Sequence, residues 1–162
     1  MYKLLLLTLM VTVWMTLHLQ QTDEEAAMKL LYQGKRAVNR AAHAAALQLD
    51  RQALSEGIIR IDEAAARAAA SSYLAANLQL SANDWKPLPN SPLREPIELL
   101  VFQIIDEGVS FPYVYRNDEY DYEATLRSPG VILIIRMEHP RIFTATPPIG
   151  WEIKGVAEQV IG

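Results

Sequence analysis

Acidic side chains gather in one short stretch, and their oxygens are the first candidates for chemistry in this 162-residue chain. Asp118, Glu119, Asp121 and Glu123 lie close together in the segment RNDEYDYE. Carboxylate oxygens are ligands that Ca²⁺ prefers, and carboxylate pairs also serve glycoside hydrolysis. The spacing does not match an EF-hand, and strand alternation would send Asp121 and Glu123 to one face. We therefore predict an exposed acidic loop and no metal or cofactor site, with Ca²⁺ binding by the loop as the alternative.

The other nucleophiles and bases show no catalytic arrangement. The serines lack a Gly-x-Ser-x-Gly elbow, and no glycine loop is present that would bind phosphate. His43 has no second ligand at zinc spacing, and His139, in a predicted turn before Pro140, has no evident partner. The chain contains no cysteine, so disulfides and thiolate metal sites are excluded. These observations predict that the protein is not an enzyme.

Small residues recur along one face of an expected helix. Gly34, Ala37, Ala41 and Ala45 follow one another at spacings of three and four. Such a ladder lets a second helix or a sheet approach closely. Close packing also explains a glycine inside a helix, where it costs about 1 kcal/mol relative to alanine. We predict a helix-packing interface at these four positions; the alternative is an Ala-rich stalk whose alanines only favour helix.

An apolar run precedes this helix. The segment from Leu4 to Leu19 carries no formal charge and would be about 24 Å long as a helix, slightly less than the roughly 30 Å hydrocarbon core. Interfacial placement of Trp14 and His18 can absorb the difference. The run can be an uncleaved anchor, a cleaved signal peptide or a buried soluble helix. Because no small-x-small cleavage site follows it, we favour a transmembrane anchor over residues 1–22.

Charge indicates the orientation and excludes one class of partner. Lys3 precedes the apolar run, whereas Asp23, Glu24 and Glu25 follow it. The positive-inside tendency therefore places the N-terminus in the cytoplasm and the rest of the chain outside the cell membrane, as a single-pass protein. The net charge of −4 argues against a nucleic-acid binder. The first expected partner is the lipid bilayer.

Beyond the anchor, helical patterns precede strand patterns. We predict an extension helix that begins near Glu24 and is closed by Gly57, so that residues 23–57 form a stalk. Residues 58–162 would form an extracytoplasmic domain, with a second helix that starts after the N-cap Asp62 and ends at Leu78. Four prolines between residues 81 and 96 predict a loop.

From Ile97 onward the apolar period is that of strands. We predict a hairpin from the segments 97–105 and 109–115, joined by the turn Asp106-Glu107-Gly108. Further strands are expected over 122–126, 131–137 and 151–161, with turns at 128–130 and around Pro147 and Pro148. Four or five antiparallel strands packed on helices predict an α+β fold.

The order of these elements resembles a known family. An N-terminal apolar anchor, a continuing Ala-rich helix (GKRAVNRAAHAAALQLD) and a C-terminal antiparallel sheet are similar to the pilin-like proteins, in particular the minor pilins and pseudopilins of tight-adherence (Tad) secretion systems. The ending VILIIRMEHPRIFTATPPIGWEIKGVAEQVI also looks like the tail of such proteins.

The resemblance implies a structural or assembly component of a surface pilus or secretion apparatus that packs by its N-terminal helix. Its partners would be other pilin-like subunits or secretion-platform proteins, with a homo-oligomer as one form. The alternative is a membrane-tethered extracytoplasmic binding module, which would use the sheet and the acidic loop to recognise a cell-wall or protein ligand.

Overall fold

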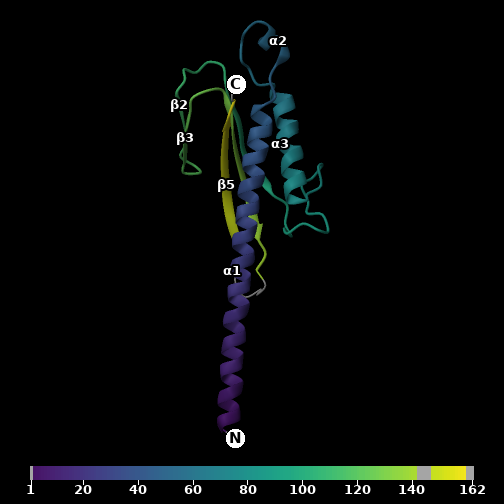
Figure 1. The fold of residues 1–162 in the computed structure, drawn as a ribbon, viewed down its shortest axis with the longest axis vertical. Coiled ribbons are helices and arrows are strands. Elements are labelled where there is room, and N and C mark those ends of the chain that lie inside the picture. The colour runs from purple at the N-terminus through teal and green to yellow at the C-terminus, as the bar shows by residue number, and fades with distance from the viewer. Residues whose placement is uncertain (1, 142–146, 160–162) are drawn as a thin grey trace.

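The chain has an α+β fold built around one long N-terminal helix (Figure 1). The computed structural model describes residues 2–141 and 147–159. In these ranges the elements are α1 (Tyr2–Ala46), α2 (Arg51–Ser55), α3 (Glu63–Leu78), β1 (Glu98–Ile105), β2 (Tyr113–Asn117), β3 (Tyr122–Leu126), β4 (Gly130–His139) and β5 (Ile149–Glu158).

Helix α1 runs without a break from the apolar segment into the domain, and at 1.5 Å per residue it is about 68 Å long. It ends at Ala46, so the prediction of one helix closed by Gly57 is wrong. Residues 48–50 pair with residues 60–62, and Asp50 caps a separate short helix: its Oδ1 accepts hydrogen bonds from the backbone N–H groups of Gln52 and Ala53 at 2.9 and 3.2 Å. Aspartate side chains favour such caps over helix interiors.

Helix α3 follows the prediction closely. Asp62 is its N-cap and accepts from the Ala65 N–H at 2.9 Å, and the helix ends at Leu78. The helix lies beside α1 and runs in the opposite direction (Figure 1). Its buried face includes Ala66 and Leu74. Small residues on both helices therefore permit a close contact.

The main sheet is antiparallel, with the strand order β1-β4-β5, and β2 and β3 form a separate two-stranded hairpin. The predicted pairing of 97–105 with 109–115 is therefore wrong. Strand β1 pairs with β4 instead, with Ile105 opposite Gly130, and β2 begins only at Tyr113. The five residues from Val131 to Ile135 are all 0% exposed, so their buried backbone N–H and C=O groups need strand partners at both edges, which β1 and β5 supply.

Alternation along β4 divides the core into two layers. Val131, Leu133 and Ile135 belong to the cluster that the sheet shares with α1 and α3. Ile132 and Ile134 belong to a second cluster, beneath the β2–β3 hairpin. The domain thus has three layers, with the helices on one face of the sheet and the hairpin on the other. The predicted last strand is observed as β5, while residues 142–146 and 160–162 lie outside the described residues.

Candidate membrane anchor and packing surfaces

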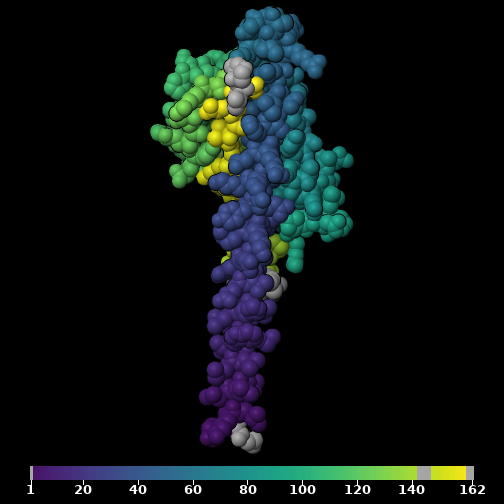
Figure 2. Space-filling view, viewed as in Figure 1, coloured from purple at the N-terminus to yellow at the C-terminus, as the bar shows by residue number. Residues whose placement is uncertain are grey.

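The outer half of α1, residues 2–22, is exposed along its whole length, and Figure 2 shows it as a rod that leaves the domain. Leu4, Leu5, Leu6 and Leu7 are between 58% and 73% exposed. Successive helical residues are about 100° apart, so these four leucines point to every side of the helix. A helix that is apolar all round is typical of a membrane span or a protein core, and no core surrounds this one.

The threonine hydroxyl groups in this half are satisfied by the helix itself. The hydroxyl groups of Thr8, Thr12 and Thr16 each donate to the carbonyl oxygen four residues earlier, at 2.9 Å. An unpaired hydroxyl in hydrocarbon costs several kcal/mol, whereas a bonded one costs far less. The structure therefore contains one helix near the N-terminus that is long and apolar enough to cross a membrane, a property that a signal sequence shares.

The inner half of α1, residues 23–46, carries the predicted small-residue stripe, and the stripe lies inside the domain. Ala37, Ala41 and Ala45 are all 0% exposed, and Gly34 is buried. A Cβ atom at Gly34 would overlap the side chains of Ile153 and Met137. The four small residues therefore serve contacts between α1 and the rest of its own chain, and those contacts need no second subunit.

A second glycine, on the sheet, permits another close contact with α1. Gly155 of β5 lies beneath Val38, and a Cβ there would come within 2.6 Å of the valine Cγ1. Helix and sheet thus approach each other closely at two points, once through a glycine on the helix and once through a glycine on the strand. Sequence spacing identified the first position but not the second.

A buried polar pair that sequence reasoning missed joins α1 to the end of the sheet. His139 Nε2 lies 3.1 Å from Asp23 Oδ1, and the two side chains are 9% and 7% exposed. His139 was expected in a turn without an evident partner; it is instead the last residue of β4, and its partner lies 116 residues earlier. The pair marks the point where α1 leaves the domain. Only the tertiary fold brings these two positions together.

The predicted acidic loop forms the tip of the β2–β3 hairpin and is exposed at Asp118, Glu119 and Asp121. Glu123 is also exposed, but it is ion-paired with the opposite strand, since its Oε2 accepts from Arg116 Nη2 at 2.6 Å. Among the described residues no group of three or more acidic or histidine side chains is arranged to hold a metal ion. The loop therefore has an exposed acidic surface rather than a preformed cage.

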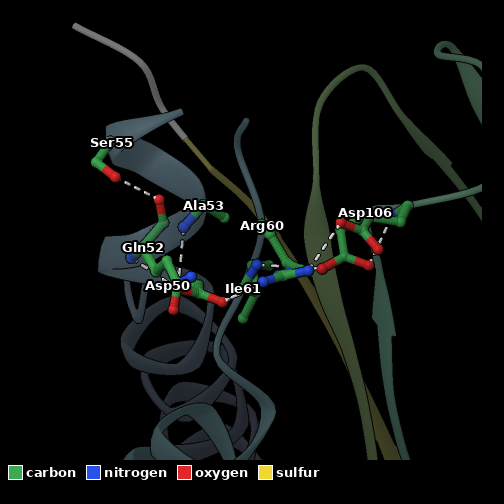
Figure 3. Close-up of polar contacts among 8 residues, drawn as sticks. Asp50, Gln52, Ala53, Ser55, Arg60, Ile61 and Asp106 are labelled. Carbon is green, nitrogen blue, oxygen red and sulfur yellow. Dashed lines mark hydrogen bonds and ion pairs between the residues drawn. The ribbon is translucent and has the colours of Figure 1, made fainter. Parts of the chain in front are cut away.

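A charged network ties the opposite end of the domain together (Figure 3). Asp50 Oδ2 accepts from Arg60 Nη2 at 2.6 Å, and Arg60 Nη1 reaches Glu107 Oε1 at 3.3 Å. Asp106 in turn accepts from the Ile61 N–H at 3.1 Å. The hydrogen bond from Arg60, together with the capping bonds, holds the pKa of the Asp50 carboxyl below its usual range. The network joins the turn after α1 to the turn after β1.

An open hollow of about 570 Å³ lies beside the end of the sheet that is nearest the outer half of α1. Side chains of both signs line it, among them Arg94, Glu98, Arg136 and Glu138. Arg136 is already paired, with Glu98 Oε2 at 3.0 Å and with Glu152 Oε1 at 3.2 Å. Paired charges of this kind stabilise the strand ends and leave the hollow without a dominant sign.

The chain was compared with known families, proteins and structures. No protein-family model, curated protein or solved structure matches the chain.

Proposed function

We propose that this chain is a single-pass membrane protein, similar in plan to the pilin-like proteins, that acts as a structural or assembly subunit of a surface pilus or secretion apparatus. One observation carries the proposal: residues 2–22 form an apolar, all-round exposed half of the same continuous helix whose residues 23–46 are the spine of the domain. An anchor that is rigidly continuous with its domain transmits position and orientation, as a subunit of an assembly requires.

The same geometry supports the anchor over a buried soluble helix. A soluble core helix would bury this segment, yet its residues are exposed. We favour the anchor over a cleaved signal because no small-x-small cleavage site follows the apolar run. We infer the membrane orientation from charge alone, with Lys3 in the cytoplasm and the domain outside.

Carbonate extraction tests the anchor. The full-length chain, expressed with a tag after Gly162, should remain in the membrane pellet at alkaline pH with residues 1–22 intact. A mature protein in the medium that begins near Gln20 or Thr22 would overturn the anchor and indicate secretion. Protease added to spheroplasts should remove the domain; full protection until lysis would reverse the orientation.

A second candidate function is a binding module on a membrane stalk. The hollow of about 570 Å³ beside Arg94 and Glu138 supports it, since its volume suits a small ligand. Soluble cell-wall fragments that raise the melting temperature of the chain in micelles, with the effect lost in Glu138→Ala, would favour this function. The subunit role is favoured when the fragments leave the melting temperature unchanged.

A further inference from the structure

A basic groove lies between α1 and α3. Its volume is about 340 Å³, and it is lined by Lys29, Gln33, Arg36, Arg40 and Asn77, with no carboxylate among these residues. Arg40 Nη1 donates to Asn77 Oδ1 at 2.8 Å, and Arg36 Nε donates to the backbone carbonyl of its own helix at Tyr32. In the described part of the chain, neither arginine lies within ion-pair distance of a carboxylate. Lys29 pairs with Glu25 Oε1 of its own helix at 3.1 Å, so the positive charge that the domain does not neutralise comes from the two arginines.

An acidic tip with the opposite character lies on the β2–β3 hairpin. The side chain of Asn117 accepts hydrogen bonds from the N–H groups of Glu119 and Tyr120, at 3.1 and 3.3 Å. Lys154 of β5 donates to the backbone carbonyls of Tyr120 and Asp121. These bonds hold the backbone of the tip, while the carboxylates of Asp118 and Asp121 point into solvent without an ion pair among the described residues.

The groove and the tip lie on opposite sides of α1. Figure 1 shows α3 on one side of the long helix and the β2–β3 hairpin on the other. One chain cannot bring its own tip to its own groove, because α1 stands between them and Lys154 ties the tip to β5. The two surfaces are complementary in charge, and only separate molecules can join them.

The two surfaces also lie at the same level along α1. Lys154 contacts the tip, and the next residue, Gly155, lies beneath Val38 of α1. Arg36 and Arg40 lie two residues before and two residues after Val38, and so at the same height along the helix. Copies anchored in one membrane share orientation and depth, so a sideways contact needs both surfaces at one height. This chain meets that condition.

We propose that the basic groove binds the acidic tip of a second copy of this chain, side by side and in the same orientation. The inference rests on the proposed function, because the membrane anchor sets the common height. The contact is heterologous, since each copy offers one groove and one tip. Such contacts extend from copy to copy into a ring or an open filament. The groove thus supplies an interface outside the buried small-residue stripe.

Disulfide crosslinking tests this contact directly, since the chain has no cysteine of its own. One full-length copy carries Tyr32→Cys, at an exposed position beside the groove, and the other carries Glu119→Cys, at the tip. Both are reconstituted into phosphatidylcholine vesicles and oxidised. We expect a crosslinked dimer from this mixture. A matched control replaces Glu119→Cys with Leu88→Cys, which is also exposed but lies in the loop after α3, and should give no dimer.

Charge reversal then separates a charge-matched contact from chance collision. Arg36→Glu in the first copy, or Asp118→Lys in the second, should lower the yield about fivefold, the effect of one or two exposed ion pairs. The two reversals together should restore the yield. Arg36 suits the test because it is exposed and its Nε donates within its own helix, to the Tyr32 carbonyl, so its replacement leaves the domain packing intact.

Each other result overturns the inference. If the yield of crosslinked dimer is unchanged by either single reversal, or does not recover in the double reversal, the groove and the tip are not in contact. If Arg36→Glu alters association only with phosphatidylglycerol vesicles while Asp118→Lys has no effect, the groove binds a lipid headgroup instead. A chain that stays in carbonate-washed vesicles but gives no dimer overturns the contact and leaves the anchor standing. Release from the vesicles overturns both.

Discussion

The two halves of α1 form one continuous helix but differ in the size and exposure of their apolar side chains. In residues 2–22 the apolar side chains are large and point to every side, and all are exposed. In residues 23–46 the buried positions are mostly small, and charged residues occupy the outward face. In the proposed membrane setting the outer half contacts only lipid and would tolerate changes of shape. The inner half fits a particular protein surface and tolerates no added volume there.

Charge in the outer half should have the largest effect. Leu6→Asp together with Met10→Asp places two carboxylates where no partner exists, at a cost to insertion of about 6 kcal/mol. The variant should leave the carbonate-resistant fraction, while its domain unfolds at the same temperature as the parent. Leu6→Ala with Met10→Ala serves as the control and should stay in the membrane. Retention of the acidic variant would contradict the assignment of this half to lipid.

Added volume in the inner half should have the next largest effect. Gly34→Leu forces atoms into the space held by Ile153 and Met137, and overpacking of this kind costs about 1 to 3 kcal/mol or more. Urea unfolding of the full chain in micelles measures the loss. Lys35→Leu adds a leucine on the exposed face and should change stability by less than about 0.5 kcal/mol. Equal effects of the two changes would show that α1 does not pack tightly on the sheet.

The junction between the halves depends on the buried pair of Asp23 and His139. Asp23→Ala removes the carboxylate that faces the ring nitrogen, and a buried polar group that loses its partner costs about 1 to 3 kcal/mol. The melting temperature in micelles should fall, with membrane retention unchanged. Asp23→Leu combined with His139→Phe removes both polar groups and should recover much of the loss. A double variant less stable than either single variant would show that the pair does not act as a unit.

The smallest effect is expected at the end of the domain farthest from the outer half. The pKa of Asp50 is lowered in the folded chain, so the ionised carboxylate contributes stability above its unfolded pKa. That contribution is lost as the pH falls through the folded value, below about pH 4. Asp50→Asn should lower the melting temperature by a few degrees at pH 7 and should flatten its decline between pH 5 and pH 2. If the melting temperatures of both proteins fall in parallel between pH 5 and pH 2, Asp50 does not contribute to the loss of stability in acid.

Several features followed from local sequence because local physics decides them. The apolar run predicts a helix that belongs outside water, since sixteen uncharged residues leave few alternatives. Asp62 and Leu78 mark the ends of α3 because a cap and a change of pattern act over one turn. The strand at 122–126 was predicted at its observed bounds, since its turn residues and alternation are contained in the segment.

Other features depended on distant residues. The break at Ala46 follows from the cap at Asp50 and from the pairing of residues 48–50 with 60–62, which helix propensity in an alanine-rich segment conceals. The partner of β1 was misassigned because a short connection favours pairing with the next strand. The fully buried β4 instead takes the central position, where both of its edges are paired.

Sequence by itself determined where this protein is apolar, where it is helical and which helix face is small, because side-chain size and polarity are local properties. Tertiary structure alone decided what each surface contacts. It placed Gly34 against the chain's own sheet, brought Asp23 to His139, and set the acidic tip level with Arg36 on the far side of α1. Contacts between residues more than a hundred positions apart depend on strand order and helix length, and no short segment contains that information.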